Sequence, residues 1–378
     1  MKLQVGIVFG GKSVEHDISI ITALQVMNAI DQSIYDIIPI YLTKDNNWLT
    51  SSAFKELSTF KEGVEVLKEK EEIFFYKNKR GYYFRPLYKR FAKSRKIDLI
   101  LPTVHGLGVE DGTISGFFEI LGIPITSADV GPSALVQDKA WTKSVLMHDL
   151  ISTLPFISYK KDDDISNLNL SSFPLIIKPA RLGSSIGIKI VKEKDELKEA
   201  LDEALRFDDK VIIEQKLKNY REFNCAVLKT NKGYLTSEVE EIKINHEFYA
   251  FSDKYEDEKV QIGKISDLIS RSCPAEISEN LTNEIKTTAL QTFKALELKG
   301  VARVDFLYDL DNLKLFVNEV NTIPGALSFY LFDRSGLTFP ELINQLIKNA
   351  IIENLAKSSQ IRVFTSSILN RKSLKINK

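Results

Sequence analysis

The sequence predicts an α/β fold, and three observations support this. Over the first part of the chain, strand-like apolar runs alternate with a helical pattern, which indicates an open, mainly parallel sheet. Residues 173–191 hold a Gly- and Ser-rich loop between two strand-like runs. Residues 300–325 hold two further runs around a turn rich in Asp and Asn, which is typical of a β-hairpin.

Composition indicates a globular protein of two or three domains. The 378 residues exceed one ordinary core, and 44% of them are hydrophobic and 27% charged. The net charge of zero gives no general attraction to nucleic acid or membrane. Cys225 and Cys273 are far apart, which argues against a disulfide framework or zinc cluster. Without an apolar run of membrane-spanning length or a signal peptide, we expect a cytoplasmic enzyme.

The N-terminal segment places a glutamate where α/β sheets bind ligands. Residues 3–9 are predicted to form a strand, followed by a turn at two glycines and a helix over about residues 14–30. Glu15 then lies near the helix N-terminus at the carboxyl end of the strand. Solvated glutamates are common in first turns, so this position alone does not decide a role. The segment lacks the third glycine of a dinucleotide fingerprint. Further strands are predicted over residues 35–42, 96–104 and 123–126.

Residues 44–96 are basic and aromatic, a combination that could bind nucleic acid. A hairpin of residues 73–76 and 82–84 is the favoured interpretation. The next loop, HGLGVEDG, holds His105, Glu110 and Asp111. A lone histidine is usually structural, but one between an apolar strand and glycines is expected to line a cleft.

The loop in KPARLGSSIG is predicted to hold phosphate. Its small residues let backbone N–H groups approach an anion, and Lys178 adds a positive charge. This loop contains no GK[ST] run and no helix follows it, so it is not a Walker A motif. The alternative is a flexible hairpin tip, which does not by itself call for Lys178 and Ser184.

Two segments between this loop and the hairpin have weaker signals. The strand VIIEQKL ends in Glu214 and could meet an adenine, while Glu222 could bind a ribose hydroxyl. A plain core strand would look the same. Residues 248–272 are predicted to form a long loop or lid that contains Lys254 and Tyr255. A helix over residues 276–299, which ends at Gly300, leads to the hairpin.

The hairpin at residues 300–325 carries four polar side chains in alternating positions. Arg303 and Asp305 are two residues apart, as are Glu319 and Asn321, so each pair shares a face of its strand. With a turn of residues 310–312, Asp305 would lie opposite Val317 and all four side chains would share one face. A turn one residue longer or shorter would separate them.

Two carboxylates and an amide on one face form an oxygen-ligand set suited to Mg²⁺. Arg303 beside them could stabilise charge that develops on a transferred phosphoryl group or a tetrahedral carbon. The alternative is a surface hairpin with ordinary charged residues. The repetition of these residue types on a half-buried face favours the metal site. A last helix is predicted over about residues 340–355, before a peripheral tail.

Eight stretches occur in the order found in one enzyme family: GGKSVEHDIS, HGLGVEDG, QDKAWTK, KPARLGSSIG, IIEQKL, DKY, ARVDF and NEVNTIPG. From about Lys2 to Lys348 the chain therefore resembles the D-alanine–D-alanine ligases, which have the ATP-grasp fold. The resemblance implies an open α/β domain at residues 1–133 and two α+β ATP-grasp subdomains at residues 134–216 and 217–357. ATP would lie between these subdomains, and residues 358–378 would form the tail.

The resemblance also implies roles for single residues. Nucleotide binding would involve Lys139, Lys178, Ser185, Glu214, Glu222 and Lys254. Two Mg²⁺ ions, for which Mn²⁺ could substitute, would bind Asp305, Glu319 and Asn321. The catalytic set would be Glu15, His105, Ser184, Tyr255, Arg303 and Gly325, where Arg303 and the Gly325 N–H stabilise the oxyanion. Tyr330 and Leu331 would meet the second substrate.

The implied reaction joins two D-alanines through a D-alanyl phosphate and yields the dipeptide, ADP and phosphate for peptidoglycan precursors. At residue 330 the family commonly has a small hydroxyl residue, and here it is Tyr330. This leaves open a different second substrate, such as D-serine, D-lactate or another amine. A non-catalytic nucleotide-binding regulator is a further alternative. The resemblance implies a homodimer that acts on small molecules.

Overall fold

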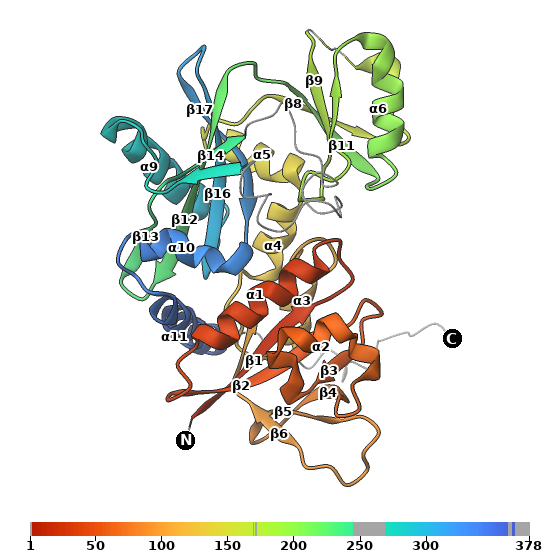
Figure 1. Ribbon diagram of the computed structural model, residues 1–378, viewed down its shortest axis with the longest axis vertical. Helices are drawn as coiled ribbons and strands as arrows, with labels where there is room; N and C mark the ends of the chain where they lie inside the picture. The colour runs from red at the N-terminus through yellow and green to blue at the C-terminus, as the bar shows by residue number, and fades with distance from the viewer. Residues whose placement is uncertain (1, 169, 171, 245–268, 362–364, 367–378) are drawn as a thin grey trace.

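Three β-sheets, formed by successive parts of the chain, make up the computed structural model (Figure 1). The structure describes residues 2–168, 170, 172–244, 269–361, 365 and 366. The N-terminal sheet lies at the lower end of Figure 1, and the sheet of the central region lies at the upper end. The predicted α/β class is confirmed. No described helix is both long enough and apolar enough to cross a membrane.

The N-terminal sheet has seven strands in the order β6-β5-β4-β3-β2-β1-β7. They are β1 (Leu3–Gly10), β2 (Tyr35–Leu42), β3 (Trp48–Thr50), β4 (Glu71–Asn78), β5 (Gly81–Pro86), β6 (Arg95–Ile97) and β7 (Leu99–Pro102). β1 pairs in parallel with β2 and β7, but the remaining neighbours are antiparallel. The prediction of a mainly parallel sheet was wrong, because β3, β4, β5 and β6, which residues 44–97 contribute, pair only with antiparallel neighbours. The predicted hairpin is confirmed as β4 and β5.

The single strand predicted over residues 96–104 is two strands, β6 and β7, at opposite edges of the sheet. The break falls at Asp98, whose carboxylate accepts hydrogen bonds from the Gln4 backbone N–H at 2.9 Å and pairs with Lys96 at 2.6 Å. These polar contacts interrupt an otherwise continuous apolar run. The strand predicted over residues 123–126 is only an isolated parallel bridge between Ile100 and Ile125.

Five helices accompany this sheet and lead away from it: α1 (His16–Ala29), α2 (Leu57–Glu62), α3 (Thr113–Leu121), α4 (Val130–Gln137) and α5 (Lys139–His148). Short 3₁₀ turns lie at η1 (Ser52–Lys55) and η2 (Val64–Val66). Asp138 begins α5, because its carboxylate accepts hydrogen bonds from the backbone N–H groups of Ala140 and Trp141. The cap places Lys139 in the first turn of this helix.

The central sheet is antiparallel, in the order β10-β9-β11-β8. Its elements are β8 (Phe156–Lys160), η3 (Ile165–Asn167), β9 (Leu175–Pro179), β10 (Lys189–Val191), η4 (Lys194–Glu196), α6 (Leu197–Ala204) and β11 (Lys210–Gln215). The apolar side of α6 packs on the sheet through Leu197, Leu201 and Ala204. The glycine-rich loop joins β9 to β10.

The C-terminal sheet follows the order β15-β14-β12-β16-β17, and β13 pairs with β12. Its strands are β12 (Tyr220–Thr230), β13 (Gly233–Thr236), β14 (Glu240–Ile244), β15 (Ile269–Ser272), β16 (Val301–Asp309) and β17 (Lys314–Asn321). The predicted helix before the hairpin is α9 (Glu279–Ala295), which buries Leu281, Ile285, Ala289 and Phe293. The chain then forms η5 (Gly325–Ser328), α10 (Phe329–Asp333) and α11 (Phe339–Ser358).

The N-terminal sheet and the last two helices share one hydrophobic core. Apolar residues of β1, β2 and β7 belong to the same buried cluster as those of α10 and α11. The hydroxyl of Tyr35 donates a hydrogen bond to the Asn344 side chain at 2.6 Å across this junction. Because the core is continuous, the N-terminal sheet has a fixed position relative to the segment that follows the β16–β17 hairpin.

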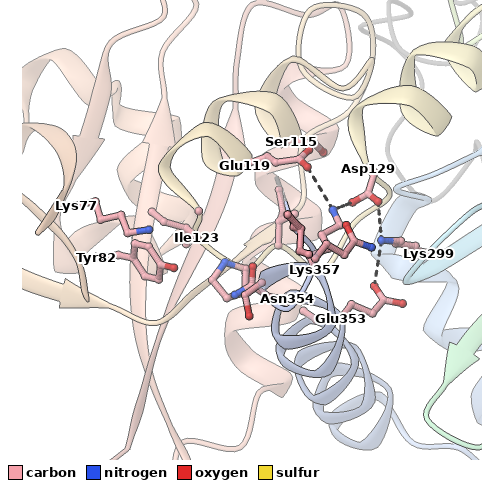
Figure 2. A pocket seen from close by; sticks show the side chains of 17 residues that line it. Lys77, Tyr82, Ser115, Glu119, Ile123, Asp129, Lys299, Glu353, Asn354 and Lys357 are labelled. Atoms are coloured by element: carbon pink, nitrogen blue, oxygen red, sulfur yellow. Dashed lines mark hydrogen bonds and ion pairs between the residues drawn. The ribbon is translucent and has the colours of Figure 1, made fainter. Parts of the chain in front are cut away.

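Ion pairs close the same junction beside a cavity of about 510 Å³, which Figure 2 shows. Asp129, before α4, lies 2.5 Å from the ammonium groups of both Lys299 and Lys357. Lys357 also lies 3.5 Å from Glu119, and Lys299 lies 3.8 Å from Glu353. Burial raises the pKa of Asp129, but the two ammonium groups outweigh this and hold it below its usual value. The network ties α3 and α4 to α11.

The Asp129→Asn variant is expected to have a Tm lower by a few degrees at pH 7, because two lysines lose their shared carboxylate. The lowered pKa means that Asp129 stabilises the fold above the unfolded pKa of about 3.9, and that this effect is lost as the pH falls through the folded pKa. Calorimetric melting at a series of pH values should show the two proteins converge below about pH 4. A difference that stays constant across the series would contradict this account.

Candidate active site

The turn of the β16–β17 hairpin is one residue longer than predicted. Asp309 pairs with Lys314 rather than with Leu313, so the turn spans residues 310–313. The Asp309 carboxylate stabilises this turn by accepting hydrogen bonds from two of its backbone N–H groups. By itself, the extra residue would move the polar side chains of the two strands to opposite faces.

A β-bulge at Asn318 restores the common face. The pairing register shifts by one residue there, so that Asp305 lies opposite Glu319 and Arg303 lies opposite Asn321. The predicted register was wrong, whereas the predicted sharing of a face by these four side chains is present. The guanidinium of Arg303 donates to both oxygens of Asp305 at 2.6 and 2.7 Å. The Asn321 amide donates to the same carboxylate at 3.1 Å.

Cross-strand pairing extends this set into a row across four strands. Glu240 on β14 lies opposite Asn224 on β12, Asn224 opposite Asp305, and Asp305 opposite Glu319. Glu222 is two residues from Asn224 and therefore shares the face. Sequence reasoning missed Glu240 and Asn224. The signal for Asn224 was its spacing of two residues from Glu222, but no local pattern marks Glu240.

The charges along this row are incompletely balanced. Burial raises the pKa of Asp305, and the nearby Glu319 and Glu240 raise it further, although Arg303 acts in the opposite direction. Burial lowers the pKa of Arg303, but the Asp305 carboxylate outweighs this and holds the guanidinium charged. A cation added near Asp305 and Glu319 would relieve the remaining repulsion.

The donor set fits Mg²⁺ better than a metal that needs a complete protein cage. Within the described part of the chain, no three His, Cys, Asp or Glu side chains converge as a metal site. Asp305, Glu319 and Asn321 offer two carboxylates and one amide oxygen, and Mg²⁺ commonly fills its shell with waters and substrate phosphates. Thiolate- or imidazole-rich zinc coordination does not match this set.

Glu15 connects the N-terminal region to the glycine-rich loop. The hydroxyl of Ser184 donates a hydrogen bond to its carboxylate. Burial raises the pKa of Glu15, and Glu319 raises it further, while Ser184 and Lys139 oppose these effects. The Lys139 ammonium lies 3.7 Å from the Glu319 carboxylate and donates to the Leu182 carbonyl at 2.6 Å. Residues from all three regions thus meet in one place.

The glycine-rich loop has a backbone shape that few residues adopt. Ser184 and Ser185 have φ angles of 54° and 61°, in the left-handed region. Gly187 has a φ of 71°, and a Cβ atom there would lie 2.8 Å from the Phe207 ring and 2.9 Å from Pro179. Only glycine fits this position, which explains the last glycine of the motif.

Lys178 and Glu214 contact each other in a buried group of charges. The Glu214 carboxylate lies 2.6 Å from the ammonium groups of both Lys143 and Lys178. Burial raises the pKa of Glu214, but the two lysines outweigh this and hold it below its usual value. Lys178 also donates to the bulged Asn318 at 3.2 Å. Roles of Lys178 and Glu214 toward ATP stay predictions, and sequence reasoning missed Lys143 and Asn318.

His105 lies beside the segment that carries Gly325. Its ring Nε2 is 3.0 Å from the Thr22 hydroxyl, whose oxygen accepts a hydrogen bond from the Ala326 backbone N–H at 3.2 Å. Burial lowers the pKa of His105 to about 4, so the ring is neutral at pH 7. Ala326, Leu327 and Ser328 all have left-handed φ angles of 51–53°. The backbone beside Gly325 is therefore tightly constrained.

The two residues predicted to meet the second substrate have different environments. The Tyr330 hydroxyl donates to a Glu240 oxygen at 3.4 Å, at the β14 end of the row. The Leu331 side chain is fully buried in the core, so any substrate contact is left to its backbone. Lys254 and Tyr255 lie outside the described residues.

One cleft collects five of the predicted residues: Glu15, Lys139, Ser184, Glu319 and Asn321. Its lining also includes Glu110, Asn318 and Thr322, which the sequence did not assign to the site. Carboxylates, an ammonium group and a small-residue loop around one space can bind a phosphorylated, amine-bearing ligand together with a divalent cation.

Comparison with known proteins agrees with this chemistry. Residues 4–128 match the family model "D-ala D-ala ligase N-terminus", and residues 150–348 match "D-ala D-ala ligase C-terminus". The chain belongs to the D-alanine–D-alanine ligase family. Membership makes it an ATP-dependent ligase, a class that uses ATP and a divalent metal ion.

Individual members of the ligase family resemble the chain over nearly its full length. A D-alanine–D-alanine ligase of Thermosipho africanus is 42% identical over 98% of this chain and 99% of its own. The solved D-alanine–D-alanine ligase of Coxiella burnetii has a TM-score of 0.80 and 28% identity, and covers 96% of this chain and 97% of its own. The VanG D-Ala:D-Ser ligase of Enterococcus faecalis has a TM-score of 0.78 and 31% identity, and covers 93% and 100%.

The buried ion group predicts how this ligase responds to mutation. Glu214→Gln leaves Lys143 and Lys178 without their shared carboxylate, which is expected to cost about 3–5 kcal/mol of stability. Adding Lys143→Met should recover part of this loss, because one buried charge is removed. Thermal and urea denaturation without ATP would measure both effects. The matched control is Glu203→Gln, which removes a half-exposed partner of Lys189 and should change stability by less than about 1 kcal/mol. Equal losses in the two single variants would contradict the account.

Proposed function

We propose that this chain is a D-alanine–D-alanine ligase, which uses ATP to join two D-alanines and releases D-alanyl-D-alanine, ADP and phosphate. The product would serve peptidoglycan precursor synthesis. The observation that carries the proposal is that Glu15, Ser184, Glu319 and Asn321 line the same cleft. Two relatives with this name, 42% and 41% identical to the chain, support it.

The first step activates a carboxylate, which is a poor electrophile. The carboxylate of the first D-alanine attacks the γ-phosphate of ATP, so that the bond to the β-phosphate breaks, ADP leaves and D-alanyl phosphate forms. Lys139 and Lys178 are proposed to hold the phosphates, together with Ser185 and Lys254. Mg²⁺ bound by Asp305, Glu319 and Asn321 would offset the charge on the phosphoryl oxygens.

Glu15 is proposed to bind the ammonium group of the first D-alanine. Its carboxylate is held by the Ser184 hydroxyl at the edge of the glycine-rich loop. Burial raises its pKa, and a bound ammonium group would favour the ionised form again. Tyr255 is proposed to join Glu15 and Ser184 in closing the site.

In the second step, the amine of the second D-alanine attacks the acyl phosphate. Arg303 and the Gly325 backbone N–H are proposed to stabilise the tetrahedral oxyanion. Arg303 is held in place by its two hydrogen bonds to Asp305. Neutral His105 would lie near the substrates, and Tyr330 and the Leu331 backbone would meet the second D-alanine.

Further details of the assignment also remain proposals. Glu214 and Glu222 would contact the adenine end and the ribose of ATP. Two Mg²⁺ ions would bind, and Mn²⁺ could replace them. The domains would span residues 1–133, 134–216 and 217–357, with a tail at 358–378. The enzyme would act in the cytoplasm as a homodimer.

A different second substrate is the main alternative, and one observation bears on it. Tyr330 replaces the small hydroxyl residue that the family commonly has, and its hydroxyl lies near Glu240 rather than in open space. The Tyr330 side chain is larger than the small hydroxyl residue that it replaces, which favours a small nucleophile such as D-alanine. The similarity to the VanG D-Ala:D-Ser ligase therefore does not make D-serine the favoured second substrate of this chain.

The direct test is phosphate release from Mg-ATP and D-alanine, with mass analysis of the product. The wild-type protein is expected to form D-alanyl-D-alanine, and Asp305→Asn is expected to lower kcat by at least about 100-fold, because a metal ligand and the partner of Arg303 are both changed. Melting curves would show that the variant folds.

The matched control is Asp309→Asn, on the same strand but at the hairpin turn, where the hydrogen bonds that the structure shows for the carboxylate go to the turn backbone and the Asn312 side chain. It should retain activity. If turnover occurs only when D-serine, D-lactate or another amine accompanies D-alanine, that compound is the second substrate instead of D-alanine. Absence of turnover with D-alanine and every one of these second substrates would contradict the proposed function.

A further inference from the structure

We propose that Glu110 is a positioning residue for the ligase reaction. Its carboxylate holds the loop of residues 322–325 against the N-terminal region, and thereby fixes Asn321 and the Gly325 backbone N–H. The inference rests on the proposed function. Glu110 belongs to the HGLGVEDG loop, in which only His105 has a role so far.

Both oxygens of Glu110 accept hydrogen bonds, each from a different segment of the chain. Oε1 accepts from the Ile323 backbone N–H at 2.8 Å and from the Thr322 hydroxyl at 3.1 Å. Oε2 accepts from the Gly106 backbone N–H at 3.0 Å, within its own loop. One carboxylate therefore joins segments that are 212 residues apart in the sequence.

The HGLGVEDG loop is itself packed against the Glu15 segment. Gly106 has a φ of 87°, and a Cβ atom there would lie 2.3 Å from the Ser13 hydroxyl and 3.0 Å from a Glu15 oxygen. Only glycine allows this approach. The loop that carries Glu110 is therefore fixed in position, and its carboxylate can fix the loop of residues 322–325 in turn.

Two further contacts from the N-terminal region reach the same segment. The Ile323 backbone forms a hydrogen bond with the His105 ring. The carboxylate of Glu110 and the ring of His105 are thus both bonded to the backbone of the same residue. Thr22 accepts the hydrogen bond of the Ala326 N–H. Gly325 lies between these attachment points. Its N–H can hold an oxyanion only if the flanking backbone does not move.

The backbone after Gly325 needs such support. Residues 326–328 are three consecutive non-glycine residues with left-handed φ angles. This conformation costs free energy and persists only where the surroundings determine it. Thr322 and Ile323, which receive Glu110, are buried at 4% and 5% exposure. The Glu110 contacts are therefore protected from competing water.

The charge state of Glu110 matters for this function. Burial raises its pKa to about 7, and the nearby Glu15 acts in the same direction, while its three hydrogen-bond donors oppose both effects. His105 faces the same segment but is neutral near pH 7, because burial lowers its pKa to about 4. The ionised carboxylate accepts all three hydrogen bonds, whereas a protonated one would present its own O–H to a donor.

The test compares Glu110→Gln with the wild-type full-length protein in the Mg-ATP and D-alanine assay. Glutamine has a similar size, but its amide nitrogen cannot accept from a backbone N–H. We expect kcat to fall about 10- to 100-fold, the scale of a small misplacement of catalytic groups, with KM for ATP and D-alanine changed by less than about 3-fold. The decline of kcat as the pH falls through about 7 should be weaker in the variant than in the wild type.

Asp111→Asn is the matched control in the same loop. The hydrogen bonds that the structure shows for Asp111 are local, to Gly108 in its loop and to Thr113 at the start of α3. Its kcat should be near that of the wild type. Thr322→Ser keeps the hydroxyl that donates to Glu110 and should be nearly as active, whereas Thr322→Val should lose part of kcat.

Each outcome decides the inference. A selective fall in kcat for Glu110→Gln and Thr322→Val, with Asp111→Asn and Thr322→Ser preserved, supports positioning by Glu110. Equal effects of Glu110→Gln and Asp111→Asn, or a loss that appears only in the Tm, would overturn it and leave the ligase function intact. A wild-type protein without turnover would overturn the proposed function, and this inference with it.

Discussion

Carboxylates with incomplete charge compensation surround the cleft, and the cations beside them determine what each one can do. Asp305 and Glu319 lie directly opposite each other on β16 and β17, and the Glu319 carboxylate raises the pKa of Glu15 in the same cleft. Like charges repel strongly in a medium of low dielectric constant. Arg303 supplies one compensating charge inside the sheet, and Lys139 supplies another 3.7 Å from Glu319. The negative charge that remains would attract a divalent cation, and through it the phosphates of a nucleotide.

This arrangement depends on how the N-terminal region is held against the end of the chain. The core that includes β1, β2 and β7 continues into α10 and α11, and the ion pairs of Asp129 close the junction (Figure 2). The segment between β17 and α10 is therefore fixed at both ends. Glu110, His105 and Thr22 contact it from the N-terminal side. The N-terminal region and the segment after β17 thus come from distant parts of the sequence, yet they belong to one hydrophobic core.

Sequence reasoning predicted the local units well, because their signals are local. The residue spacing of two predicted the shared face of Arg303 and Asp305, and the glycines predicted the loop between β9 and β10. Two kinds of feature were out of reach. The pairing register of β16 and β17 depends on the bulge at Asn318, which no residue pattern marks. The largely apolar run over residues 96–104 gave no sign that the chain passes at Asp98 from one edge strand of the sheet to the other. The contacts of Glu110 with Thr322, and those of Glu240 with Asn224 and Tyr330, arise only through tertiary structure, since these partners lie far away in the chain.

The measurement that tests the central claim most directly is calorimetric titration of Mn²⁺ into the protein in the presence of saturating ADP, for the wild type and for Glu319→Gln. The account holds that the row on β16 and β17 binds the divalent cation. It predicts that Mn²⁺ affinity falls by at least about 10-fold in the variant while the fold is retained, because a carboxylate opposite Asp305 is lost. Equal Mn²⁺ affinity in the two proteins would contradict the account and would place the metal elsewhere.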